Sequence, residues 1–163
     1  MNKTEQHRSI VREALSKHTY GHQRQAAERT FSKFQNGARA VVIAAEMQSG
    51  KSGIALALAS MQRLLLSDEI ICQRKYLKDT LYLVTMADVA LQEQAKNDLA
   101  ACNNVVVSNF AHFESCLKGE FKFQAPKLII IDECHYGSAT DSVRYAKVFD
   151  YLEKINLECR IAF

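Results

Sequence analysis

The sequence AVVIA at residues 40–44 is followed directly by AEMQSGKS at residues 45–52. The first run is apolar and rich in β-branched residues without polar alternation, which predicts a strand covered on both faces. Residues 52–66, SGIALALASMQRLLL, are apolar on nearly every side, which is typical of a helix packed on a sheet. A strand, a glycine-containing turn and a buried helix in this order predict a loop that binds phosphate.

Each residue of the Gly50-Lys51-Ser52 turn has its own expected role. Gly50 leaves room for phosphate oxygens, Lys51 reaches the outer phosphates, and the Ser52 hydroxyl can ligate Mg²⁺. The backbone N–H groups that would cradle the phosphates belong to Gln48, Ser49, Gly50, Lys51, Ser52 and Gly53. The first glycine of the strict G-x-x-x-x-G-K-[ST] pattern is replaced by Ala45, and a chance G-K-S at the start of a core helix is the competing interpretation.

A pair of carboxylates follows a second apolar run, LIII at residues 128–131. This run predicts a strand, so Asp132 and Glu133 would emerge at its carboxyl end, the edge where open α/β sheets bind ligands. We expect Asp132 to hold Mg²⁺, mainly through water, and Glu133 to orient and deprotonate the water that attacks the terminal phosphate. The alternative is that the two residues merely cap a helix.

Strands and helices alternate along the remainder of the chain, which predicts an α/β domain with a mainly parallel sheet and helices on both faces. We expect an N-terminal helical extension at residues 1–20 and one nucleotide-binding domain at residues 21–163. The predicted helices cover residues 4–18, 22–36, 88–101, 110–117 and 141–154. Further strands are predicted at residues 81–84, 105–107 and 159–163, and a basic exposed connection at residues 67–78.

Composition limits the class of protein. With 163 residues, 48% of them apolar and 24% charged, the chain can form one hydrophobic core and is not a disordered polymer. No apolar run is long enough to span a membrane, and the polar start MNKTEQHRSI does not suggest a signal peptide, so a cytoplasmic location is expected. The formal charge of +3 permits binding to nucleic acid without predicting it. Neither a disulfide framework nor a zinc site is indicated by the five scattered cysteines, Cys72, Cys102, Cys116, Cys134 and Cys159.

The two motifs together resemble a known family. SGKS at residues 49–52, four residues after Ala45, and DECH at residues 132–135 look like motifs I and II of the DExH group of superfamily 2 helicases and translocases. Their separation, 132 − 51 = 81 residues, is similar to that within the first lobe of such proteins. The resemblance implies a RecA-like P-loop NTPase lobe that uses ATP and Mg²⁺. It also implies an ATPase of helicase type acting on single- or double-stranded nucleic acid, with DNA favoured.

The resemblance extends to weaker positions. Gln23, in preference to Gln25, matches a glutamine that reads adenine, although it could equally be a solvent-facing helix residue. In the family, the residues at the positions of Thr85, Gln94, Ser108 and Asn109 touch the nucleic-acid backbone, and here they could equally be simple helix caps. His135 corresponds to a residue that couples the nucleotide site to a second lobe, whereas the other histidines show no ligand-like grouping.

The family's motif III, second RecA-like lobe and arginine finger would come after residue 163. We therefore expect a second lobe or partner protein from elsewhere, because an arginine finger is worth about 10³-fold or more in rate. One alternative is a stand-alone nucleotide-binding interaction or regulatory protein with little turnover. Another is a small-molecule kinase, for which the basic cluster Arg74, Lys75 and Lys78 would have to serve as a lid.

Overall fold

A five-stranded parallel sheet forms the centre of the protein. The computed structural model describes residues 2–45, 50–67, 78–84, 88–122, 125–132, 150–151, 154 and 160–162. The strand order is β1-β5-β4-β2-β3, and every pairing is parallel, which confirms the predicted sheet. The strands are β1 (Ala40–Val41), β2 (Thr80–Val84), β3 (Val105–Asn109), β4 (Leu128–Asp132) and β5 (Arg160–Ala162).

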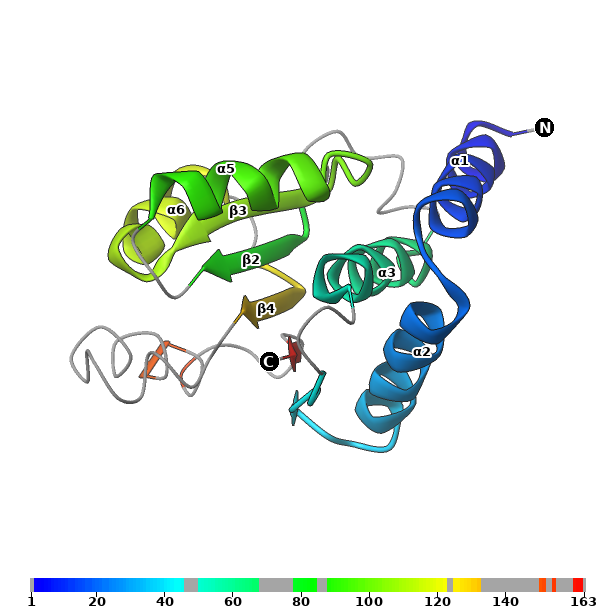
Figure 1. The fold of residues 1–163 in the computed structure, drawn as a ribbon, viewed down its shortest axis with the longest axis horizontal. Coiled ribbons are helices and arrows are strands. Elements are labelled where there is room, and N and C mark those ends of the chain that lie inside the picture. Colours follow the sequence, from blue (N-terminus) through cyan, green and yellow to red (C-terminus); the bar gives the residue numbers. More distant parts are fainter. Residues whose placement is uncertain are drawn as a thin grey trace.

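Helices lie on both faces of this sheet (Figure 1). Both α1 and α2 pack against α3, and α2 also contacts β1. Within the described ranges, no helix is long and apolar enough to cross a membrane. The helices are α1 (Lys3–His18), α2 (Gly21–Gln35), α3 (Lys51–Leu64), α5 (Val89–Asp98) and α6 (Phe113–Gly119), with a short 3-10 helix, η2 (Phe110–His112).

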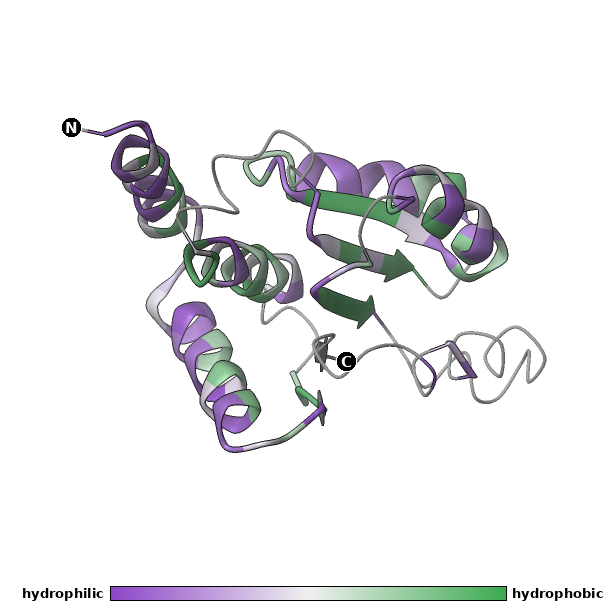
Figure 2. Ribbon diagram, turned by 180° about the vertical axis from the view of Figure 1, so that it is seen from behind, coloured by the Kyte–Doolittle hydropathy of each residue, from purple (hydrophilic) through white to green (hydrophobic). Residues whose placement is uncertain are grey.

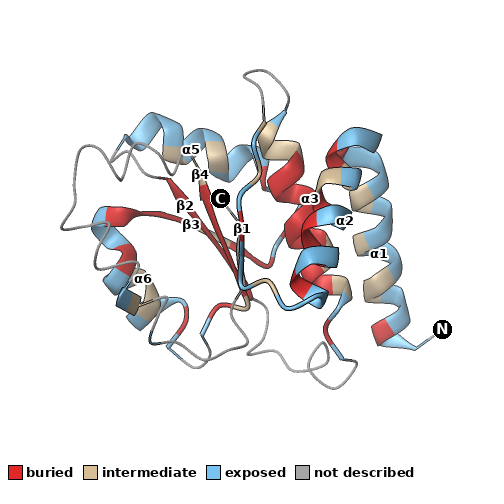
Figure 3. Cartoon of the chain, turned by 90° about the horizontal axis from the view of Figure 1, so that it is seen from below, coloured by how far each residue is buried: buried red, intermediate tan, exposed pale blue. Residues whose placement is uncertain are grey.

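The central strands bury alternate residues in two hydrophobic clusters. Tyr82 and Val84 pack with α2 and α3 on one face, whereas Leu81 and Leu83 pack with η2 and α6 on the other. β4 alternates in the same way, with Leu128 and Ile130 on the α3 face and Ile129 and Ile131 on the α6 face. Figure 2 shows these strands as mainly hydrophobic, and Figure 3 shows that α3 is buried while α1 and α5 expose much of their surface. Burial on both faces explains why these strands have no polar alternation.

The strand that leads to the phosphate loop differs from the prediction. β1 contains only Ala40 and Val41, and Ala40 is exposed. The next residue, Val42, is 74% exposed, so the expected strand covered on both faces is wrong for this segment. The reason is its position, because β1 pairs with β5 and is an edge strand of the described sheet. An apolar run cannot by itself distinguish an edge strand from a central one.

Most predicted helices agree with the structure to within a few residues, but α5 ends early. It stops at Asp98 instead of continuing to residue 101. Tertiary contacts account for this, because Asn104 is buried and its Nδ2 donates to the Ala59 carbonyl of α3 at 3.1 Å. The buried Cys102 thiol also contacts the Ser60 hydroxyl at 3.2 Å. The predicted connection at residues 67–78 and helix at residues 141–154 lie largely outside the described residues.

A buried polar network holds the amino edge of the sheet together. The Asp79 carboxylate accepts hydrogen bonds from Asn104 Nδ2 at 2.7 Å and from Thr80 Oγ1 at 2.9 Å. It also pairs with Arg63 Nη1 of α3 at 3.3 Å, and both side chains of this ion pair are only 2% exposed. Burial raises the pKa of Asp79, while these hydrogen bonds and the Arg63 charge lower it. The network therefore connects α3 to the starts of β2 and β3.

Helix α1 completes this network from outside the sheet. Its His7 Nε2 accepts a hydrogen bond from Arg63 Nε at 3.2 Å. The neighbouring Arg8 guanidinium donates to the carbonyls of Leu64 and Leu66, where α3 ends. A helix leaves its last carbonyls without intrahelical donors, so Arg8 caps α3. The N-terminal helix is thereby fixed to the end of α3 that lies farthest from the phosphate loop.

Candidate functional site

The site begins where the chain enters α3. Gly50 precedes the helix with φ 74° and ψ 51°, a left-handed conformation that strongly favours glycine. Its carbonyl accepts hydrogen bonds from Gly53 N at 2.9 Å and from Ile54 N at 3.3 Å, which form the first turn. Lys51 and Ser52 open this turn and are half-buried. The positive end of a helix with a lysine at its first position is suited to an anionic phosphate group.

The Gln23 side chain from α2 lies directly against this turn. Its Nε2 donates to the Gly50 carbonyl at 2.9 Å, and its Oε1 accepts from Tyr20 N at 2.8 Å. A Cβ added to Gly53 would lie 2.3 Å from each of the Cδ, Nε2 and Oε1 atoms of Gln23. A Cβ added to Gly50 would lie 2.3 Å from Nε2. The two glycines of the turn therefore make space for a glutamine amide.

The burial of Gln23 excludes one of its two sequence-based interpretations. Gln23 is 4% exposed, so the solvent-facing interpretation is wrong. Gln25, the other candidate, is exposed on α2. The predicted contact between Gln23 and adenine stays a prediction.

Asp132 ends β4 at the carboxyl edge of the sheet. The register aligns it with Val84 of β2, which is in turn level with Asn109 of β3. Side chains alternate along a strand, so Asp132 shares the face of Leu128 and Ile130, which pack in the cluster that contains α3. β5 separates β4 from β1, so two strand spacings of ~4.8 Å each lie between the Asp132 strand and the strand that precedes the loop. The start of α3 and this carboxylate thus lie toward one edge and on one face of the sheet.

The Ser52 hydroxyl has a partner that sequence analysis did not find. Ser52 Oγ donates to Asp98 Oδ2 of α5 at 3.0 Å. The two residues are 46 positions apart, and a lone aspartate at a helix end carries no signal for such a contact. The bond directs Ser52 toward a carboxylate on a different element from Asp132. Hydroxyl and carboxylate oxygens are nevertheless the hard ligands that Mg²⁺ prefers, so Ser52 and Asp132 fit the ion chemically.

The residues predicted to touch nucleic acid fall into two groups. Gln94 is exposed on α5, whereas Ser108 and Asn109 are each 5% exposed. Asn109 caps η2, with its Oδ1 accepting from His112 N at 3.0 Å, and its Nδ2 donates to Gln92 Oε1 at 3.0 Å. The helix-cap interpretation therefore describes Asn109 in this structure.

Several predicted positions lie outside the described residues. They are Gln48, Ser49, Thr85, Glu133 and His135, together with Arg74 and Lys75 of the basic cluster. Among the residues that are described, no three His, Cys, Asp or Glu side chains group as a metal site.

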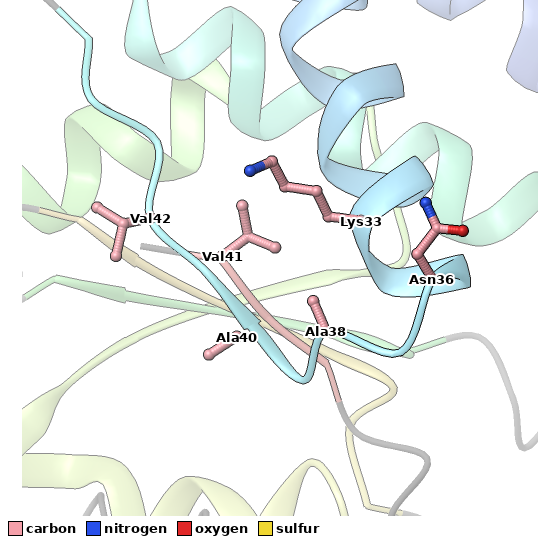
Figure 4. Close-up of a pocket in the computed structure, with 6 residues that line it drawn as sticks. All are labelled: Lys33, Asn36, Ala38, Ala40, Val41 and Val42. Atoms are coloured by element: carbon pink, nitrogen blue, oxygen red, sulfur yellow. The ribbon is translucent and has the colours of Figure 1, made fainter.

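Two surface hollows lie apart from the phosphate turn. One, of about 490 Å³, lies at the β1 edge, where Lys33 and Asn36 from the end of α2 border an apolar surface (Figure 4). That surface is formed by Ala38, Ala40, Val41 and Val42. The other, of about 470 Å³, lies beside β3 and the end of α5. Neither lining includes Gly50, Lys51 or Asp132, so the chemistry of the turn does not depend on these hollows.

Comparison with known proteins shows the family of the chain. No curated protein matches the chain. The family model described as "Type III restriction enzyme, res subunit" matches residues 16–163, which leaves most of α1 outside the match. That domain is a RecA-type ATPase lobe of the superfamily 2 helicase kind, in agreement with the parallel sheet and the loop-to-α3 turn. The chain therefore belongs to the family of type III restriction enzyme res subunits.

Proposed function

We propose that this chain is the ATP-binding and ATP-hydrolysing lobe of a helicase-like motor that acts on nucleic acid, with DNA favoured. The observation that carries the proposal is the convergence of the Gly50–Ser52 turn and Asp132 on one edge and one face of the sheet, in a chain of this family. A chance G-K-S sequence at the start of a core helix would not require a carboxylate at a strand end on the same face of the sheet. The edge where parallel strands end is also where α/β sheets bind ligands.

Each residue of the edge then has a chemical task. The α3 N-terminus and Lys51 bind the phosphates, which are held by charge and by backbone N–H groups. Ser52 and Asp132 would hold Mg²⁺, which neutralises charge on the phosphates when it is bound. Glu133, next in sequence to Asp132, would take the proton of the attacking water, and His135 would couple the site to a second lobe. The Ser52 hydroxyl donates its hydrogen to Asp98, so its oxygen lone pairs would be the atoms that ligate the ion.

Nucleic acid would bind along the same carboxyl edge. Thr85 directly follows β2, Ser108 and Asn109 end β3, and Gln94 is exposed on α5. Neutral polar groups of this kind contact phosphates and sugars without selecting a sequence. Because Ser108 and Asn109 are buried here, this role requires them to become accessible when the strand binds.

ATP turnover by this chain, with and without single-stranded DNA or RNA, tests the proposal. We expect the Glu133→Gln variant to bind ATP like wild type and to lose whatever hydrolysis the wild type performs. Turnover is expected to increase when a second RecA-like lobe is supplied, because the arginine finger then completes the site. Binding of ATP with negligible turnover under all conditions would instead support a stand-alone regulatory protein. A chain that binds no triphosphate would contradict both functions.

A further inference from the structure

We propose that the outer edge of β3 is a docking site for an extended, acidic segment of a partner protein, which adds a strand to the sheet there. In the described part of the chain, β3 is the last strand of the sheet and pairs only with β2. An edge strand presents N–H and C=O groups with which another chain can pair. The site lies apart from the phosphate turn, so the inference does not depend on nucleotide binding.

The hydrogen bonds to β2 show which backbone groups of β3 face away from the sheet. Thr80 N donates to the Asn104 carbonyl at 3.1 Å, and Thr80 is level with Val105. In a parallel pair, the N–H and C=O of one residue point to the same side of its strand, and those of the next residue point to the other side. Asn104 and Val106 therefore point these groups at β2, whereas Val105 and Val107 point theirs outward. An added strand would bond to the outward groups.

β3 lacks the features that usually protect an edge strand. Natural proteins shorten such strands or place lysine, proline or a bulge on them. β1, which ends the described sheet on the other side, has only two residues. β3 has five, VVVSN, none of which is charged or a proline. The edge of β3 is therefore long enough and apolar enough to accept a further strand.

A hollow of about 470 Å³ lies along this edge, between the helices that contact β3. Val105, Val106 and Val107 all line it. Val107 packs against the cluster that contains Leu99, next to the end of α5, whereas Val106 packs against the cluster beside α6. Figure 3 shows α5 and α6 on opposite sides of β3. The side chains of an added strand alternate between the same two sides, so the hollow leaves room for them.

The charged side chains of the hollow favour an acidic partner. Its described lining carries Lys78, Lys96 and Glu120, so two of the three charges are positive. Lys96 pairs with Glu93 at 3.0 Å in an exposed ion pair, which can exchange partners at small cost. Lys78 is half-buried and has no ion-pair partner among the described residues. A carboxylate on the incoming strand would complement these two lysines.

A second copy of this chain fits the same edge less well. Lys78 precedes β2 and Lys96 lies in the last turn of α5, so both are near the amino end of β3. In a two-fold pair of antiparallel β3 strands, the amino end of one meets the carboxyl end of the other. That end carries Ser108 and Asn109, which offer the lysines no carboxylate.

The experiment uses a synthetic peptide of alternating valine and glutamate, and a matched peptide in which lysine replaces glutamate. Backbone amide signals of the isotope-labelled protein are followed by NMR during titration. We expect the glutamate peptide to shift the Val105 and Val107 amide signals, and the lysine peptide to leave them unchanged. The Val42 amide at the β1 edge is the internal control and should not move.

Hydrogen exchange of the Val107 amide gives a quantitative readout of the same binding. With the glutamate peptide at about ten times its Kd, exchange should slow by about tenfold. No shift or slowing at β3, an equal response to both peptides, or a response confined to Val42 would each overturn the proposal. Slowing that appears without peptide as the protein concentration rises would overturn it in favour of a second copy.

Two proline variants test the inferred direction of the backbone. Val107→Pro removes an outward N–H without removing a bond to β2, and proline is tolerated at such edge positions. We expect its thermal unfolding to stay near that of the wild type and its affinity for the glutamate peptide to fall by about tenfold. Val106→Pro removes a bond to β2 and should lower thermal stability clearly. Equal stability losses in the two variants would contradict the outward direction of Val107.

A charge reversal tests the acidic preference without changing the strand. The double variant Lys78→Glu and Lys96→Glu should bind the glutamate peptide about tenfold more weakly and should gain affinity for the lysine peptide. Lys33→Glu, which reverses a lysine at the β1 hollow, is the matched control and should bind like wild type. Unchanged preference in the double variant would overturn the assignment of an acidic partner.

Discussion

The two ends of α3 use polar groups in opposite ways. At its start, Lys51 and Ser52 are half-buried, and the Ser52 hydroxyl is bonded to an exposed carboxylate that a ligand could displace. At its end, Arg63 and Asp79 are almost fully buried and are bonded to Asn104, Thr80 and His7. Both ends carry a cation and a carboxylate. The two ends differ in burial: the polar groups at the start are accessible to a ligand, whereas those at the end are enclosed and support the structure.

This difference in burial explains how one helix can have one end that resists change and another end whose polar groups can exchange partners. Buried charges that satisfy one another resist change, because removing one leaves the other uncompensated in a medium that solvates it poorly. Charges near the surface can exchange partners at small cost. The buried end of α3 therefore holds the helix in place, and its other end is the one that we propose binds phosphate.

The largest expected effect comes from disrupting the buried ion pair at the end of α3. Asp79→Ala should lower the free energy of unfolding by about 3–5 kcal/mol, because it leaves the Arg63 guanidinium buried without its carboxylate. Urea unfolding followed by circular dichroism measures this loss. Glu93→Ala is the control, since Glu93 pairs with Lys96 at 3.0 Å on the surface and should contribute little. Equal losses in the two variants would remove the distinction between the two ends of α3.

The next effect concerns the phosphate end. Lys51→Ala should lower ATP affinity by roughly 10- to 100-fold, the value of a hydrogen bond to a charged group, with only a small change in unfolding free energy. Titration with a fluorescent ATP analogue measures the affinity. Lys96→Ala, which removes an exposed lysine on α5, should leave it unchanged. An unaltered titration in a folded Lys51→Ala protein would contradict the phosphate-loop assignment.

A pH experiment sharpens the comparison at the buried end. Burial lowers the pKa of His7, helped by the charges of Arg63 and Arg8 and opposed by Asp79. Because its folded-state pKa lies below the unfolded value of about 6.5, its contribution to stability is fully present above that pH and is lost as the pH falls from there through the lower folded-state pKa. His7→Gln can still accept from Arg63 but does not titrate.

We therefore expect wild-type stability to fall more steeply than that of His7→Gln as the pH is lowered from about 8 to about 5. The difference between the two proteins isolates His7 from the other titrating groups, including Asp79. Parallel curves would show that the His7–Arg63 contact does not depend on the neutral imidazole.

The smallest effect returns to the phosphate end. Asp98→Ala removes the partner of Ser52 and a negative charge near the phosphates, so affinity for Mg²⁺–ATP should rise about two- to fivefold, or by ~0.5–1 kcal/mol. Competition titration against the same fluorescent analogue is sensitive enough to detect this. Reduced affinity would instead make Asp98 part of the site.

Local patterns in the sequence were enough for much of the fold. The apolar run at residues 128–131 and the polar residues after it predicted β4 with Asp132 at its end, as observed. A turn before a buried helix was predicted at Gly50, and the structure has this turn at the start of α3; the left-handed conformation of Gly50, with φ 74°, was not part of the prediction. These features depend on neighbours in the chain, for which sequence spacing is sufficient information.

Contacts between distant segments were not predictable in the same way. The exposure of Val42 depends on β1 being an edge strand, and the burial of Gln23 depends on how α2 meets α3. Nothing near Asp98 or His7 in the sequence indicates their bonds to Ser52 and Arg63. Such pairings follow from how whole elements pack.

The sequence by itself determined a parallel α/β lobe with a phosphate loop at one strand end and a carboxylate at another, because hydrophobic period and glycine placement act over a few residues. Only the tertiary structure decided that Gln23 bonds to Gly50, that Ser52 is held by Asp98, and that Arg63 is satisfied by Asp79 and His7. The physical reason is that a buried hydrogen bond or ion pair depends on distance in space and on exclusion of water. Packing sets both of these between residues far apart in the chain.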